Sequence, residues 1–550
     1  MPRAPPFQTT LTFVVRTQNS LKDPLEKSTV NSHIARVTHE RRRKKEGARQ
    51  KLVRVQEQES DSDDSSSLQL AASPYQLLGS GRADPFDSQS VVINASVDWL
   101  LSFVRDCLMP PTGKSVAQKQ RALAWNAQFI QDVSFALQDE CLAYAYLSRF
   151  AAILSTILVD NRLKILALTY KAEVSSRLRL RLRAQRPSDY GNIESICWLI
   201  YSLLAADVAA QDYAAASLHG KILRCLLQPE GKPVPFLENR RLVRSILWQD
   251  TQRATLTLTR TSFELDQFVR HFLPEIPKSM DEWYDLLDDL LPSEGSGRPT
   301  IVLDEVLQCR DFRLMFSETK LYFSTIKVAV ANTTLINDLT FALATRSILM
   351  QAHLVNKYTT FKTEADGLDP PDPSNVLHRH AFMSLATLYW IRFACLHENS
   401  LNPNSPGEWT RAPFIGRQRA ATALKPLILE TAGNSLIYGA GPGIIRALRQ
   451  IMTYTKEYAM SMVNDPETKF RLWALYVGAI AEQAQDGFDG TEEKAHGNWH
   501  NIEFVQHAGL MGLYQWEEVE DKLKKFLYVE HIGVGARKWF VWFQSKEGFS

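Results

Sequence analysis

Residues 444–462, IIRALRQIMTYTKEYAMSM, indicate the fold class of this chain more clearly than any other stretch. Side chains able to face a core recur there at alternating steps of four and three residues, at Ile444, Leu448, Ile451, Thr455, Tyr458 and Met462. Steps of this size match the 3.6-residue period of an α-helix, so one face of the segment is expected to be buried. The segment therefore predicts a helix that packs against a larger body.

The same spacing occurs over most of the chain after residue 91. It is found at Trp125, Phe129, Val133 and Leu137, and again at Trp516, Val519, Leu523 and Phe526. Asp465 followed by Pro466 is typical of an N-cap and a first helical position, so another helix is expected to begin there. Strand-like alternation is confined to short stretches such as 255–259. These patterns predict an all-α fold, with one large irregular helical domain over residues 91–550.

Residues 1–90 differ from the rest of the chain because they show no sustained periodicity. Residues 1–55 contain thirteen Lys or Arg and four Asp or Glu, a net charge of +9, so the remaining residues carry −7. The Ser/Asp run at 60–67 cannot bury enough apolar surface to offset its ordering entropy. We therefore expect a disordered basic arm over residues 1–90, placed before the helical domain.

The densest positive charge in the arm is a run of five basic residues, Arg41, Arg42, Arg43, Lys44 and Lys45. Such a run suits the acidic groove of a nuclear import receptor, or a phosphate backbone, because charge rather than shape supplies the affinity. Short Lys/Arg clusters are typical of nuclear import segments. These five residues are the candidate site for nuclear import or nucleic-acid contact, and a solvated tail without a partner is the alternative.

The sequence contains no motif of a known catalytic centre. It has neither a Gly-x-Ser-x-Gly elbow nor a phosphate-binding P-loop. The acidic stretch 281–291, DEWYDLLDDLL, imitates the first magnesium motif of helical terpenoid synthases, but the second motif fails because Phe341 stands where Ser or Thr is required. An amphipathic surface helix or an acidic activation segment also fits this stretch. We expect no enzymatic activity and no cofactor, with a helical magnesium-diphosphate enzyme as the remote alternative.

Metal binding is not expected from the histidines or the cysteines. His378 and His380 could offer two imidazoles, but no Cys, Asp or Glu pattern completes a site around them. The six cysteines are scattered and often have apolar neighbours, which favours buried, reduced thiols in a cytosolic or nuclear protein. The most apolar stretch, residues 141–159, is interrupted by Arg149, so no membrane span is expected.

Several motifs near the two ends of the chain occur in an order that resembles a known family. They are LTFVV at 11–15, NSHIAR at 31–36, LGSGRADPFDS at 78–88, RLWALYVG at 471–478 and MGLYQWEEV at 511–519. The order resembles the fungal transcription-factor-like proteins, a branch of the fungal-specific transcription factor domain family that often lacks the zinc binuclear cluster. The Gly-x-Gly-Arg-x-Asp-Pro-Phe element within 78–88 is the most specific part of the resemblance.

The resemblance implies a nuclear transcription-regulator-like protein whose helical domain serves regulation, ligand sensing or partner binding. A zinc binuclear cluster needs six closely spaced cysteines, and the first cysteine here is Cys107, so no zinc-cluster DNA-binding domain is expected. The implied partners are a nuclear import receptor and either the transcription machinery or a DNA-binding protein, with direct DNA contact left open. The alternative function is a helical protein-interaction scaffold with no role on DNA.

Overall fold

The computed structural model describes a large part of the chain after residue 90. The described residues are 91, 97, 99–101, 131–158, 160–184, 193–230, 237, 239–274, 276, 282, 312–321, 336–368, 372, 374, 376–398, 442–461, 468–486, 499–528 and 530–546. The predicted arm, residues 1–90, lies outside this set, and so do Arg41, Arg42, Arg43, Lys44 and Lys45.

The described residues form α-helices and no strand, which confirms the predicted all-α fold class. The labelled helices are α4 (Glu140–Leu158), α5 (Asn161–Ala184), α6 (Ile193–Ala209), α7 (Tyr213–Leu227), α8 (Arg240–Thr257), α9 (Leu265–Phe272), α12 (Ile336–Asp366), α13 (Val376–Glu398), α15 (Pro442–Tyr454), α16 (Lys456–Ser461), α17 (Thr468–Asp486), α19 (Trp499–Leu510), α20 (Trp516–Lys524) and α21 (Glu530–Lys546). Residues 312–321 are also helical. None of the helices within the described ranges has the length and apolar character that crossing a bilayer requires.

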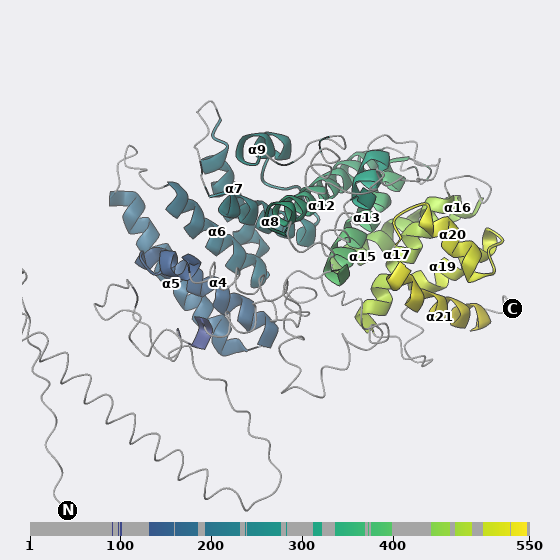
Figure 1. Ribbon diagram of the computed structural model, residues 1–550, viewed down its shortest axis with the longest axis horizontal. Helices are drawn as coiled ribbons and strands as arrows, with labels where there is room; N and C mark the ends of the chain where they lie inside the picture. The colour runs from purple at the N-terminus through teal and green to yellow at the C-terminus, as the bar shows by residue number, and fades with distance from the viewer. Residues whose placement is uncertain are drawn as a thin grey trace, which may run out of the picture. The chain divides into compact units, whose positions relative to one another are not determined.

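Most packing occurs between helices that are close in sequence. Helix α4 contacts α5 and α6, and α6 contacts α7 and α8. Further along the chain, α12 lies alongside α13, and α13 also contacts α15 and α17 (Figure 1). Helix α17 then packs on α19. Because α8 contacts both α6 and α12, it joins the earlier helices to the later ones.

Local capping by polar side chains explains where several helices begin. The carboxylate of Asp212 accepts a hydrogen bond from the Ala215 amide at 3.2 Å at the start of α7. The Asn239 side chain accepts one from the Leu242 amide at 3.1 Å at the start of α8. Such bonds satisfy amide groups that have no partner within the helix.

The core around the C-terminal helices is strongly aromatic. Trp473, Tyr476 and Phe504 are fully buried, and Phe316 from the helical residues 312–321 is buried among them. The Phe316 ring lies 5.3 Å from the ring of Trp473 and 6.4 Å from that of Phe526, measured between centroids. Segment 312–321 is thereby anchored to the C-terminal helices.

Helix α8 departs from the usual amphipathic pattern because a run of its polar residues is buried. Asp250 has no exposed surface, and Arg253 is almost completely buried beside it. The carboxylate of Asp250 accepts bonds from Arg253 Nε at 3.0 Å and from the Ser262 amide at 2.6 Å. A buried charge is tolerable when it is paired and hydrogen-bonded in this way. The strand-like alternation at 255–259 proves to be the end of α8, with Leu258 in the left-handed C-cap conformation.

The helix predicted over residues 444–462 is wrong in one respect, because it is interrupted at Thr455. Ile444, Leu448 and Ile451 are buried in α15, as their spacing predicts. The hydroxyl of Thr455 instead bonds to the Ile451 carbonyl at 3.0 Å and accepts a bond from Arg471 Nη1 at 3.0 Å. A contact from a distant helix therefore stabilises the break.

The expectation of buried cysteines holds for two of the described thiols and is wrong for a third. Cys141 and Cys197 are buried, and burial raises the pKa of Cys197 to about 12. Cys225 is exposed on α7. Its apolar neighbours Leu223 and Leu227 face the core, but the helical turn directs position 225 to the solvent.

Candidate functional site

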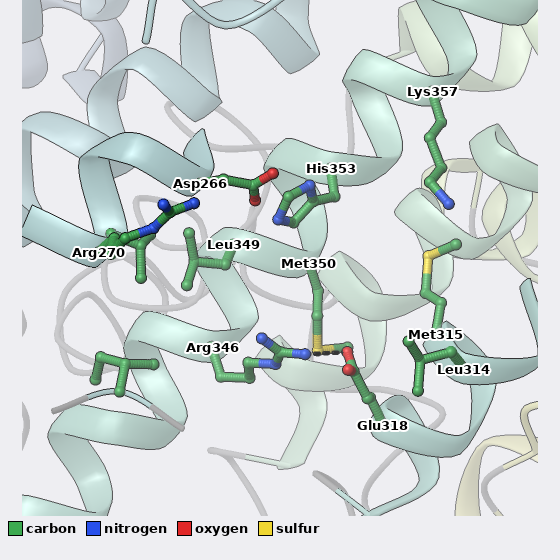
Figure 2. Close-up of a pocket in the computed structure, with 12 residues that line it drawn as sticks. Asp266, Arg270, Leu314, Met315, Glu318, Arg346, Leu349, Met350, His353 and Lys357 are labelled. Carbon is green, nitrogen blue, oxygen red and sulfur yellow. Dashed lines mark ion pairs between the residues drawn. The ribbon is translucent and has the colours of Figure 1, made fainter. Parts of the chain in front are cut away.

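A cavity of about 360 Å³ lies between α9, residues 312–321 and α12, and we call it the α9–α12 cavity. Figure 2 shows the side chains arranged around it. Its polar lining consists of Asp266, Arg270, Glu318, Arg346, His353 and Lys357. Its apolar lining consists of Val269, Ile276, Leu314, Met315, Leu349 and Met350. Cavities that combine an apolar wall with a few convergent polar groups are typical of small-molecule sites.

Helix α12 supplies the largest share of the lining because five of its residues fall on one face. Arg346, Leu349, Met350, His353 and Lys357 recur at steps of three, one, three and four residues. On a helix these positions lie one above the other. Within this face, Leu349 and Met350 are nearly fully buried and form the floor of the cavity.

One ion pair is built into the wall of the cavity. Arg346 on α12 and Glu318 in segment 312–321 form a salt bridge, and both side chains are largely buried (Figure 2). Burial raises the pKa of Glu318, while the attraction of the Arg346 guanidinium and its hydrogen bond oppose that rise. The pair holds segment 312–321 against α12.

His353 faces a carboxylate from another helix. Figure 2 shows its imidazole and the carboxylate of Asp266, on α9, directed toward each other. Burial lowers the pKa of His353, Asp266 opposes this, and the positive charges of Arg346 and Lys357 add to the lowering. His353 is therefore neutral at neutral pH and can donate and accept a hydrogen bond.

Arg270 and Lys357 complete the charged lining. Arg270 lies on α9 one turn after Asp266 and is exposed to solvent. Lys357 lies at the other side of His353 on α12, and its ammonium is 5.9 Å from the centroid of the Phe312 ring. Because three cations face two carboxylates, the lining carries a formal net charge of +1 when His353 is neutral.

The two histidines considered as metal ligands in the sequence, His378 and His380, pack against aromatic side chains. His380 packs between Phe312 and Phe361, with ring centroids 5.3 Å and 5.0 Å away. His378 packs against Tyr454 with centroids 5.0 Å apart. In the part of the chain that the structure describes, no group of three or more His, Cys, Asp or Glu residues is placed to hold a metal ion.

The acidic stretch 281–291 contributes only Glu282 to the described residues, so its interpretation as an activation segment or a magnesium motif lies outside them. The predicted import residues, 41–45, also lie outside the described residues. None of the predicted site residues takes part in the α9–α12 cavity.

A second cluster of polar side chains is buried between α17 and α19, and we call it the C-terminal cluster. The carboxylate of Glu482 accepts bonds from the His500 amide at 3.0 Å, from His500 Nδ1 at 2.7 Å and from Asn501 Nδ2 at 3.1 Å. The bond from the His500 amide caps the first turn of α19, and the two side-chain bonds fix the His500 ring and the Asn501 amide group beside it. The other edge of the His500 ring lies so close to Gly478 that a Cβ there would be 2.2 Å from His500 Cδ2. Because Glu482, His500 and Gly478 are in direct contact, we interpret the cluster as structural.

Comparison of the chain with family models, with curated proteins and with solved structures gave no match.

Proposed function

We propose that this chain is a non-enzymatic nuclear regulatory protein whose helical domain senses a small ligand. The observation that carries the proposal is the α9–α12 cavity, which combines a buried apolar floor with convergent charged groups. Its twelve lining residues include no serine, threonine or cysteine that an adjacent base could activate as a nucleophile. The lining therefore suits binding better than covalent catalysis.

The position of the cavity supports sensing rather than storage of a ligand. Segment 312–321 presents Met315 and Glu318 to the cavity, and the same segment inserts Phe316 against Trp473 in the C-terminal core. A ligand that displaces this segment would also change the packing of α17. A regulatory domain needs such a packed connection between its ligand site and the surface that its partners bind.

The nuclear part of the proposal rests on the sequence. Arg41, Arg42, Arg43, Lys44 and Lys45 supply the charge density that an import receptor or a phosphate backbone would bind. The family resemblance adds a role in transcription without a zinc-cluster DNA-binding domain. The transcription machinery or a DNA-binding protein would then be the partner on chromatin.

The test is imaging of the fluorescently tagged full chain in a fungal cell, combined with capture of chromatin-associated protein. The proposal predicts a nuclear, chromatin-associated protein. Replacing all five basic residues with alanine should disperse the chain into the cytosol while its thermal unfolding stays unchanged, because an arm that the sequence predicts to be disordered would contribute few native contacts. Unchanged localisation of the variant would refute the assigned import role.

A protein-interaction scaffold with no role on DNA is the second candidate, and the outer face of α5 favours it. Ile165, Leu168 and Leu180 on this helix are 63%, 55% and 62% exposed. Exposed apolar side chains on one helix are a common feature of protein-binding surfaces. A cytosolic, chromatin-free distribution of the unmodified chain would favour the scaffold over the nuclear regulator.

A further inference from the structure

We propose that the α9–α12 cavity binds a small organic acid, with one carboxylate group on a compact apolar body. This inference deepens the proposed ligand-sensing function and rests on it. Three properties of the cavity support it, namely the sign of its charge, the chemistry of its floor and its size.

The charge of the lining favours an anion. Arg346 and Glu318 neutralise each other in a largely buried salt bridge, so this pair adds no net charge. The other charged lining residues are Asp266, Arg270 and Lys357, which sum to +1. A carboxylate bound here would bring the total to zero, whereas an ammonium group would raise it to +2. Attraction between opposite charges is screened by solvent at the exposed Arg270 and is stronger beside the half-buried Lys357.

The placement of the polar groups limits where the carboxylate can bind. Arg270 approaches from α9 and Lys357 from α12, with His353 between them on the cavity wall (Figure 2). A neutral imidazole can donate one hydrogen bond to a carboxylate oxygen without adding charge. Because the two cations lie on opposite sides of the imidazole and the Asp266 carboxylate faces the ring, a carboxylate here would meet one cation and the neutral donor, on the side away from Asp266.

The floor of the cavity favours an apolar body on the ligand. Met315, Leu349 and Met350 are all at least nine-tenths buried and line the cavity with hydrocarbon and thioether groups. Methionine side chains adapt to ligands of different shape, because they are unbranched and polarisable. The floor has no fixed polar group for a sugar or a polyol among these three residues.

The volume sets an upper limit on the ligand. About 360 Å³ is near the lower end of the range in which small-molecule sites are found. A single-ring or short-chain acid fits this space better than a nucleotide or a long-chain lipid. A diphosphate would also carry more negative charge than a net +1 lining can balance.

The experiment is titration calorimetry of the full chain with three probes that share one skeleton, 3-phenylpropionate, 3-phenylpropan-1-ol and 3-phenylpropylamine. The inference predicts that the acid binds at least about fivefold more tightly than the alcohol, and that the amine binds most weakly. Raising the salt concentration should weaken binding of the acid and leave the alcohol unchanged.

Two variants locate the carboxylate, and a third serves as a control. Removal of the cation that the carboxylate meets, by Arg270→Gln or by Lys357→Gln, should weaken binding of 3-phenylpropionate about fivefold to tenfold, with little effect on the alcohol. Arg537→Gln removes an exposed cation on α21 that pairs with Glu517, and it should leave all three affinities unchanged. Thermal unfolding of each variant shows that it is folded.

Absence of binding by all three probes, a preference for the amine, or acid binding that survives both cavity variants would overturn the inference. These outcomes leave the nuclear localisation and chromatin association of the chain untouched. Conversely, tight acid binding by a protein that stays in the cytosol would refute the proposed nuclear function and preserve the assigned ligand class.

Discussion

The C-terminal cluster and the α9–α12 cavity both contain a histidine next to a carboxylate, yet they use these groups differently. Glu482 receives several hydrogen bonds, and His500 is packed against Gly478 without intervening space. In the cavity, Asp266 and His353 face each other at the edge of an open volume. Polar groups that hold helices together are surrounded by protein atoms, whereas groups that can bind a ligand border unfilled space.

This comparison predicts that substitutions in the C-terminal cluster affect stability most. Gly478→Ala should lower the free energy of unfolding by about 3 kcal/mol, because the new methyl group would overlap the His500 ring and displace the cap of α19. Gly443→Ala is the matched control, since its nearest neighbour would be the Leu256 carbonyl at 3.9 Å, an ordinary contact. Chemical denaturation measures both. Equal stability of the two variants would show that His500 is not packed as described.

A second prediction concerns another buried histidine of α19. Its Nε2 donates a hydrogen bond to the Thr468 carbonyl at 3.0 Å, and burial lowers the pKa of His507 to about 4. An unfolded histidine, with its pKa near 6.5, takes up a proton first as the pH falls, so the contribution of His507 is present above pH 6.5 and lost toward pH 4.

The expected loss from His507 is about 2 kcal/mol of unfolding free energy between pH 7 and pH 5. His507→Gln keeps a side-chain donor but has no proton to take up, so it should flatten the stability profile over this interval. Denaturation curves at several pH values measure the difference. Parallel profiles for the two proteins would contradict the account of His507.

In the cavity, pH should change ligand affinity more than stability. Because burial lowers the pKa of His353, its positive charge forms only below the usual histidine range. A carboxylate ligand favours that charge, so binding of 3-phenylpropionate should tighten as the pH falls from 7 to 5.5. His353→Gln should remove the tightening, as calorimetry at the two pH values can measure. Weaker binding at the lower pH would contradict the predicted sign.

The smallest expected effect is on stability at the mouth of the cavity. Arg270→Gln should change the free energy of unfolding by less than about 0.5 kcal/mol, since the side chain is exposed and forms no hydrogen bond or ion pair among the described residues. Chemical denaturation of Arg270→Gln and Gly478→Ala side by side measures the smallest and the largest expected losses of unfolding free energy. A large loss of stability in Arg270→Gln would show that this side chain helps to hold the helices together.

Helical periodicity predicted much of the described fold because burial on one face of a helix leaves a regular trace in the sequence. Trp516, Val519, Leu523 and Phe526 are buried as their spacing predicts. The break at Thr455 could not be predicted, since it depends on Arg471 reaching it from another helix. The alternation at 255–259 was misleading because a threonine can also fit a helix end, where the Thr257 hydroxyl donates a hydrogen bond to the Arg253 carbonyl of α8 at 2.8 Å.

The cavity is harder to derive from sequence because three separated segments contribute to it. Asp266, Glu318 and His353 belong to different helical segments, and no short motif joins them. One indication was present, since Arg346, His353 and Lys357 follow helical spacing through a largely apolar stretch. A stripe of basic residues on one helix is also typical of a solvated face. Only the packing of α9 and segment 312–321 against α12 shows that these residues line a cavity and do not simply face solvent.

The central claim is that the helical domain binds a small organic acid in the α9–α12 cavity, and methyl NMR of methionine-labelled full chain tests it most directly. The chain has ten methionines, of which Met315 and Met350 line the cavity, while Met383 and Met452 are buried elsewhere. Titration with 3-phenylpropionate should produce saturable shifts in the Met315 and Met350 methyl signals and leave those of Met383 and Met452 in place. Unmoved Met315 and Met350 signals at a saturating probe concentration would contradict the claim.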